Sequence, residues 1–141
     1  MKWQSSTQIM LFGSIILGFF ITSSLLVNSV CDIKISLTKF YQALWMALWM
    51  VLLELAMYPS APALVYVATF IVIVAVFYLA RNQVLVNDKE YLKAMIQHHS
   101  SAILTSDQIL KKTENEKVRK LAQWISKSQQ EEIDYMNSLL H

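Results

Sequence analysis

The sequence predicts an all-α protein in which three transmembrane helices precede an antiparallel helical hairpin that pairs into a four-helix bundle. Hydrophobic residues make up 55% of the 141 residues and charged residues only 16%, which is unusually apolar for a soluble domain of this length. The apolar residues crowd into the first 80 positions, whereas most of the charge follows them. We therefore expect a transmembrane region over residues 1–81 and a hairpin domain over residues 87–141.

The transmembrane region contains three apolar runs, at residues 9–27, 40–58 and 61–80. Each run is close to the roughly 20 residues that a helix needs to cross a bilayer core. The first run is too long for the apolar core of a cleaved signal peptide, so we expect it to be retained as a span. Only three residues, 58–60, separate the last two runs, and Pro62 begins the next helix, which predicts a tight hairpin in the bilayer.

Two features inside these runs bear on function. Glu54 is the ionisable residue that lies well within an apolar run, and a desolvated membrane carboxylate is by default a functional candidate. It is also four residues from the end of its run, so it could reach the headgroup region, and we expect that interfacial or structural role. Met46, Met50 and Met57 share one helix face and could pass Cu(I), but we expect them to serve as packing.

The charge and cysteine content exclude two classes of protein. A net charge of +2, with basic residues that alternate with Glu and Gln, does not form the patch that nucleic acids require. The single cysteine, Cys31, rules out a disulfide or a cysteine-based zinc site within one chain. We therefore expect the lipid bilayer, and no nucleic acid, among the partners.

Capping signals divide the second half into two helices. Asn87 with Glu90 three residues later forms a capping-box pattern, and Thr113 with Glu116 repeats it. These signals place the turn near residues 112–115. Because both helices carry an apolar stripe at helical spacing, we expect the stripes to pack against each other in an antiparallel hairpin.

The two stripes are interrupted by polar residues at the same level. Equal rise along antiparallel helices places His99 level with Ser128, and Met95 near Glu132. Burial of an unpaired imidazole or carboxylate costs several kcal/mol, so these groups should satisfy each other or bind a ligand. One alternative is that His99 is a core histidine hydrogen-bonded to Gln129 or Glu132 and binds no metal.

The other alternative is a metal site. Met95 and His99 are four residues apart and share a helix face, where a thioether and an imidazole suit Cu(I) or Cu(II). His98 points about 100° away from His99. Completion of the coordination sphere would therefore need Met136 or Glu132, or His98 from a partner chain.

A lone hairpin leaves an apolar edge uncovered, formed by Tyr91, Trp124 and Tyr135. Pairing of two hairpins about a two-fold axis would cover this edge and build a four-helix bundle. We therefore expect a homodimer or a higher homo-oligomer, with another membrane protein as the alternative partner.

Two stretches carry a resemblance to a known family. The segment "RNQVLVNDKEYLKAMIQHHSSAILTS" at residues 81–106, followed by "SQQEEIDYM" from Ser128, resembles the domain-of-unknown-function family numbered three hundred and five. That family has a Met-Ile-x-His-His-x-x-Ala-Ile helix and a later Gln-x-x-Glu-Ile-x-x-Met helix, which correspond here to residues 95–103 and 129–136. The resemblance implies a ferritin-like helical fold, and the three preceding apolar helices resemble a membrane-anchored subgroup.

The resemblance also suggests copper, because some soluble relatives bind copper through Met and His ligands and are linked to copper tolerance. The matching positions are Met95, His98, His99 and Met136, with Gln129 and Glu132 in support. Two positions depart from the pattern: Gln97 replaces a proline, and Thr105 replaces the methionine typical of soluble copper binders.

We expect no enzyme. The Glu-x-x-His motifs of a di-iron oxidase are missing, and Ser100 or Ser101 with His98 would lack a group to orient the imidazole. Two hypotheses remain: a membrane-anchored protein that binds copper for buffering, sensing or tolerance, and a structural or interaction module in which the histidines form a polar lock.

The orientation in the membrane is predicted differently by charge and by resemblance. Lys34, Lys39 and Arg81 outnumber Lys2, so the positive-inside rule favours a cytoplasmic hairpin. Anchored relatives instead place this domain outside the cytoplasm. We expect a multi-pass protein of the bacterial inner membrane with its hairpin on the periplasmic or outer side.

Overall fold

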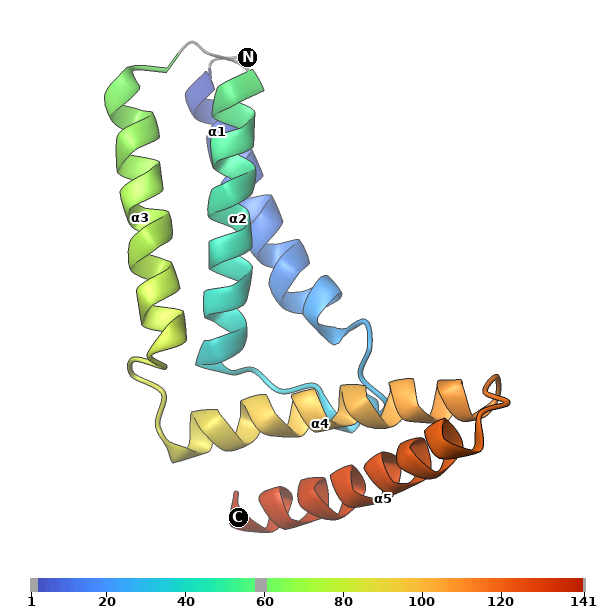
Figure 1. Ribbon diagram of the computed structural model, residues 1–141. Coiled ribbons are helices and arrows are strands. Elements are labelled where there is room, and N and C mark those ends of the chain that lie inside the picture. The colour runs from blue at the N-terminus through green and yellow to red at the C-terminus, as the bar shows by residue number, and fades with distance from the viewer. Residues whose placement is uncertain (1–2, 58–60, 141) are drawn as a thin grey trace. The chain divides into compact units, whose positions relative to one another are not determined.

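The computed structural model describes residues 3–57 and 61–140, and these residues form helices and connecting segments without a β-strand. The long helices are α1 (Trp3–Ile16), α2 (Leu37–Met57), α3 (Ala63–Arg81), α4 (Asp88–Leu110) and α5 (Glu116–Leu139). The predicted all-α class, with three long apolar helices before a hairpin, is confirmed (Figure 1). The pairing of hairpins into a four-helix bundle stays a prediction.

The contacts between residues divide the chain into two units. The three-helix unit consists of Met1–Ser23 and Leu37–Leu85, and the hairpin unit consists of Ser24–Ser36 and Val86–His141. The segment that connects α1 to α2 therefore packs with the hairpin that follows α3. This grouping cannot be read from sequence order, because residues 37–85 of the chain separate the two parts of the hairpin unit.

The three-helix unit contains three segments long and apolar enough to cross a membrane: Ser5–Ser24, Leu37–Met57 and Ala63–Arg81. The first of these segments, Ser5–Ser24, differs from the predicted run at 9–27. It begins earlier, and after Ile16 the backbone continues as a π-helical turn over Leu17–Ile21 and a 3₁₀ turn over Thr22–Ser24. Hydropathy alone does not reveal where a backbone leaves α-helical geometry. The predicted turn at 58–60 lies outside the described residues.

Helix α2 packs against both α1 and α3 (Figure 1). Leu48 of α2 forms a buried cluster with Ile73 and Val76 of α3. On the other side, Gly18 allows a close approach, since a Cβ atom there would lie 2.8 Å from the Met46 Cε atom and 3.4 Å from the Ala43 Cα atom. Small residues at such contacts are typical of packed transmembrane helices.

The end of α3 contains two residues with left-handed backbone conformation. Gln83 has φ 48° and Leu85 has φ 62°. The Val84 N–H donates to the Leu79 carbonyl at 3.0 Å, and the Gln83 N–H donates to the Ala80 carbonyl at 3.3 Å, which together form a Schellman motif. Leu85 is 82% exposed, so its strained backbone is not compensated by burial of its side chain.

Helices α4 and α5 form the antiparallel hairpin (Figure 1). Its core is a cluster of Ile96, Ile103, Ile133 and Met136. The predicted cap at the start of α4 is confirmed, because Asn87 Oδ1 accepts a hydrogen bond from the N–H group three residues later at 3.0 Å.

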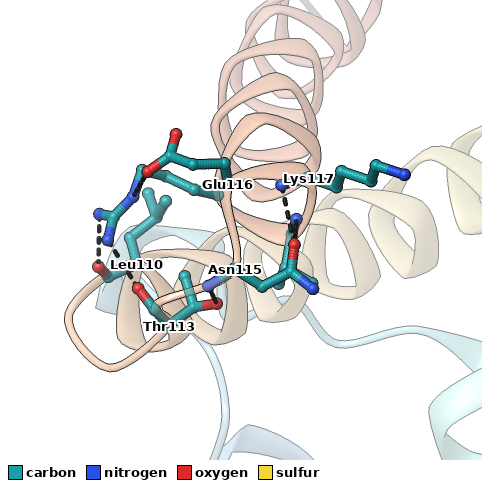
Figure 2. Close-up of polar contacts among 7 residues, drawn as sticks. Leu110, Thr113, Asn115, Glu116 and Lys117 are labelled. Carbon is teal, nitrogen blue, oxygen red and sulfur yellow. Dashed lines mark hydrogen bonds and ion pairs between the residues drawn. The ribbon is translucent and has the colours of Figure 1, made fainter.

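The cap of α5 is not the predicted one (Figure 2). Asn115, and not Thr113, is the N-cap, since its Oδ1 accepts from the N–H groups of Lys117 at 2.9 Å and Val118 at 3.4 Å. The Thr113 hydroxyl oxygen accepts from the Asn115 N–H instead, at 3.2 Å. Both residue types cap helices well, so the local pattern did not distinguish them.

Arg119 fixes this turn from inside α5. Its guanidinium donates to the carbonyl oxygens of Leu110 at 3.3 Å and Thr113 at 2.6 Å, and Glu116 Oε1 lies 3.4 Å from its Nε (Figure 2). These bonds satisfy carbonyl groups at the end of α4 that have no partner within the helix. The turn therefore spans residues 111–115, and α5 begins at Glu116.

Candidate functional site

The candidate site centres on His99, which lies on the α5-facing side of α4 with 9% of its side chain exposed. The Nδ1 atom lies 2.8 Å from the Met95 carbonyl oxygen one turn earlier. Because a carbonyl oxygen can only accept, Nδ1 carries a hydrogen and donates it. The Nε2 atom lies 2.5 Å from Glu132 Oε2 on α5. The prediction that the polar interruptions of the two helices meet is therefore confirmed at His99 and Glu132.

The contact partner of His99 on α5 lies one helical turn beyond the residue that was predicted level with it. His99 was predicted level with Ser128 but contacts Glu132, four residues further along. Ser128 instead donates to the carbonyl of Ile125 in its own helix, at 3.2 Å. The turn itself lies close to its predicted position, at residues 111–115. Glu132 was the alternative partner predicted for His99, and the two side chains meet because each leans toward the N-terminus of its own helix.

The structure brings the predicted methionines into one cluster. Met136 is a buried member of the hairpin core, and Met95 packs against that core. Glu132 directly precedes Ile133, another core member. His99 follows Met95 by one turn, so the imidazole, the carboxylate and both thioether side chains belong to the same end of the hairpin core.

His98 is placed differently. It is exposed, and its ring centroid lies 5.9 Å from that of His99 in an edge-to-face arrangement. Within the described residues, no group of three or more His, Cys, Asp and Glu side chains could hold a metal ion. We call the level of the hairpin at which His99 meets Glu132 the His99 layer. A metal in the His99 layer would therefore draw its further ligands from the methionine thioethers or from a second chain.

Sequence reasoning missed the contacts of Ser100, which is fully buried. Its hydroxyl donates to Asp32 Oδ2 at 2.7 Å and accepts from the backbone N–H groups of Asn28 at 3.0 Å and Ser29 at 3.4 Å. The Ser100 side chain thus attaches the segment between α1 and α2 to α4. A bond from a hydroxyl to a carboxylate is among the stronger hydrogen bonds in proteins.

Gln97 makes a second attachment to the same segment. Its side-chain oxygen accepts from the Lys34 N–H at 3.3 Å. The signal in the sequence was the polar run Gln97 to Ser101, which covers more of the helix circumference than one partner helix can contact.

In the three-helix unit, Glu54 turns inward. It is only 6% exposed, and the hydroxyl of Ser6 on α1 donates to its Oε1 atom. The carboxyl group therefore packs against α1 and does not extend to the outside of the unit. Met57 is 72% exposed and lies on the outer surface, whereas Met46 and Met50 are 37% and 38% exposed and therefore partly covered.

These features define a helical protein with three span-length helices and a hairpin in which a histidine and a glutamate meet in an apolar core. The chain belongs to the family described as "Domain of unknown function (DUF305)", which matches residues 78–140, and the predicted resemblance is confirmed. The chain is also similar to "Uncharacterized protein L153" of Acanthamoeba polyphaga mimivirus. The two are 36% identical over 135 residues, which cover 94% of this chain and 89% of the relative. No solved structure matches the chain.

Proposed function

We propose that this protein is a membrane-anchored metal-binding protein that holds a copper ion at the His99 layer, for copper buffering, sensing or tolerance and without catalysis. The observation that carries the proposal is the orientation of His99. Its Nδ1–H donates to the Met95 carbonyl, and its Nε2 faces Glu132. Metal-binding histidines typically donate one ring N–H to a carbonyl in this way, which fixes the tautomer that leaves the other nitrogen for the metal.

The chemistry of the neighbouring side chains supports copper over harder ions. Met95 lies one helical turn before His99, and Met136 lies one turn after Glu132, both in the hairpin core. A thioether with an imidazole is a ligand set suited to Cu(I). Glu132 is 53% exposed along its side chain, so the layer is open to solvent on one side. An ion can enter there by displacing the Glu132 carboxylate from Nε2.

The proposal includes a bilayer and a second copy as partners. The three span-length helices support membrane anchoring. On the hairpin, Tyr91, Trp124 and Tyr135 are 54%, 67% and 66% exposed, a surface that a second hairpin would cover. In such a dimer the exposed His98 could supply a further ligand to the partner's layer.

The test is a Cu(I) competition titration of the full chain in detergent micelles against a chromophoric Cu(I) chelator. We expect the wild type to withdraw copper from the chelator, and His99→Asn, Met95→Leu and Met136→Leu each to weaken binding by about 10-fold or more. Met50→Leu, in the three-helix unit, is the matched control and should bind as the wild type does. Copper retention that is equal in all variants, or no retention by the wild type, would contradict the proposal.

One observation favours a second candidate, a structural module in which His99 is a polar lock. Both ring nitrogens of His99 already have protein partners, as a metal-free core histidine requires. A lock predicts that Glu132→Gln lowers the melting temperature while Cu(I) leaves the wild-type melting temperature unchanged. Copper binding predicts the opposite response to Cu(I), since a ligand that binds the folded state raises its stability.

A further inference from the structure

The three-helix unit contains a second polar cluster, separate from the His99 layer. Glu54 lies in the last turn of α2 and is 6% exposed. Its Oε1 accepts from the Ser6 hydroxyl of α1. Its Oε2 is buried and has no hydrogen-bond partner among the described residues, and the same is true of the hydroxyl oxygen of Thr7, the next residue on α1.

The charges around this carboxyl group do not compensate it. Helix α1 carries no charged residue over Trp3–Ile16. On α3 the charged residue is Arg81, at the far end of that helix, and on α2 Lys39 lies about four turns before Glu54. The titratable group of α3 nearest in sequence to its start is Tyr66, whose hydroxyl donates to the Leu55 carbonyl at 2.6 Å. Within the part of the chain that the structure describes, no cationic side chain is therefore placed to neutralise Glu54.

A buried carboxylate without a compensating charge is costly, by several kcal/mol, whereas one bound positive charge removes that cost. The cluster offers one carboxylate and two hydroxyl oxygens, a set of hard oxygen donors. A divalent ion would leave an excess positive charge in the apolar unit, and a soft ion such as Cu(I) would find no sulfur or nitrogen donor among these three residues. The chemistry therefore fits a single hard positive charge.

We infer that Ser6, Thr7 and Glu54 form a binding site for one Na⁺ ion within the three-helix unit. The unpartnered Glu54 Oε2 and Thr7 hydroxyl are the oxygens that the cation engages. This site goes beyond the copper function, because it lies in the other unit and uses none of its residues. A protein that fails the copper titration could still carry it.

The experiment uses dicyclohexylcarbodiimide, an apolar reagent that reacts with protonated carboxyl groups. The carboxyl oxygen bonds to the carbodiimide carbon, and the carboxyl proton moves to a carbodiimide nitrogen. The full chain in detergent micelles is labelled in Na⁺-free buffer across a pH series, with added NaCl or an equal concentration of KCl, and the modified residue is identified by mass spectrometry. Glu54→Gln is the control for site specificity.

We expect labelling at Glu54 in Na⁺-free buffer. Suppression by Na⁺ but not by K⁺ identifies the Na⁺ site. For a Na⁺ site, Thr7→Val should raise the Na⁺ concentration needed for protection by about 10-fold, and Thr7→Ser should restore it. Labelling at Glu54 that Na⁺ does not suppress contradicts the inference.

Two further results would overturn the inferred cation site. One is the absence of labelling at Glu54 throughout the series in folded protein whose Glu54 becomes labelled after denaturation. The other concerns Lys2, which lies outside the described residues and four positions before Ser6. If Lys2→Gln is required for labelling to appear, a fixed ion pair with Lys2, and not an exchangeable cation, neutralises Glu54.

Discussion

Replacement of Ser100 by alanine should release the segment between α1 and α2 from helix α4. The substitution removes one hydrogen bond to the Asp32 carboxylate at 2.7 Å and leaves the Asn28 N–H without its acceptor at 3.0 Å. A hydrogen bond to a charged group contributes about 1.5–3 kcal/mol and a neutral one about 0.5–1.5 kcal/mol. Because Asp32 is half-buried, water recovers part of this energy, and we expect a net loss of about 2–3 kcal/mol.

Such a loss corresponds to a roughly 30- to 150-fold larger population of the released segment. Amide hydrogen exchange in the full chain measures that population directly. Exchange at Lys34, whose N–H donates to Gln97 Oε1 at 3.3 Å and keeps that acceptor in the variant, should accelerate by this factor in Ser100→Ala, while exchange in the core of α5 stays unchanged. Ser101→Ala is the matched control, because the Ser101 hydroxyl donates to the Gln97 carbonyl of its own helix at 3.1 Å. Equal exchange in both variants would refute the reasoning.

Three further substitutions test the packing, the cap and the backbone. Ile96→Ala, at a fully buried site, should lower the free energy of unfolding of the hairpin by about 2–5 kcal/mol, as measured by urea denaturation. Ile109→Ala, at a 41% exposed site, should lower it much less. Equal losses in the two variants would contradict the assigned core. Asn115→Ala should lower the free energy of unfolding by about 1 kcal/mol through loss of the α5 cap, and Glu114→Ala, the control, should leave it unchanged. A larger loss in Glu114→Ala would exclude Asn115 as the cap. Leu85→Gly should raise the melting temperature, because glycine removes about 1 kcal/mol of strain at φ 62°, and Leu85→Ala should not; a gain in both variants would argue against strain relief.

Local patterns predicted much of the fold. The apolar runs predicted three long helices, and Asn87 predicted the start of α4, because hydropathy and capping depend on residues close in sequence. The choice between Thr113 and Asn115 failed, since the bonds of Arg119 to the turn involve residues up to nine positions away. The turn nevertheless lies at residues 111–115, close to its predicted place at 112–115.

Chemical complementarity predicted one part of the candidate site. A buried imidazole on one helix and a carboxylate on the other were expected to meet, and His99 and Glu132 do so. The attachment of Ser100 to Asp32 joins residues 68 positions apart, and no periodicity in the sequence encodes such a contact. The inward turn of Glu54 was missed for the same reason, because its partner Ser6 lies on another helix.

X-ray absorption at the copper edge of the Cu(I)-loaded full chain tests the central claim most directly, since it reports the atoms bound to the metal. We predict a coordination shell that contains imidazole nitrogen together with thioether sulfur. The imidazole contribution should disappear in His99→Asn, and the sulfur contribution should disappear in the double variant Met95→Leu with Met136→Leu. A shell of oxygen ligands alone, or one that these substitutions leave unchanged, would contradict copper binding at His99.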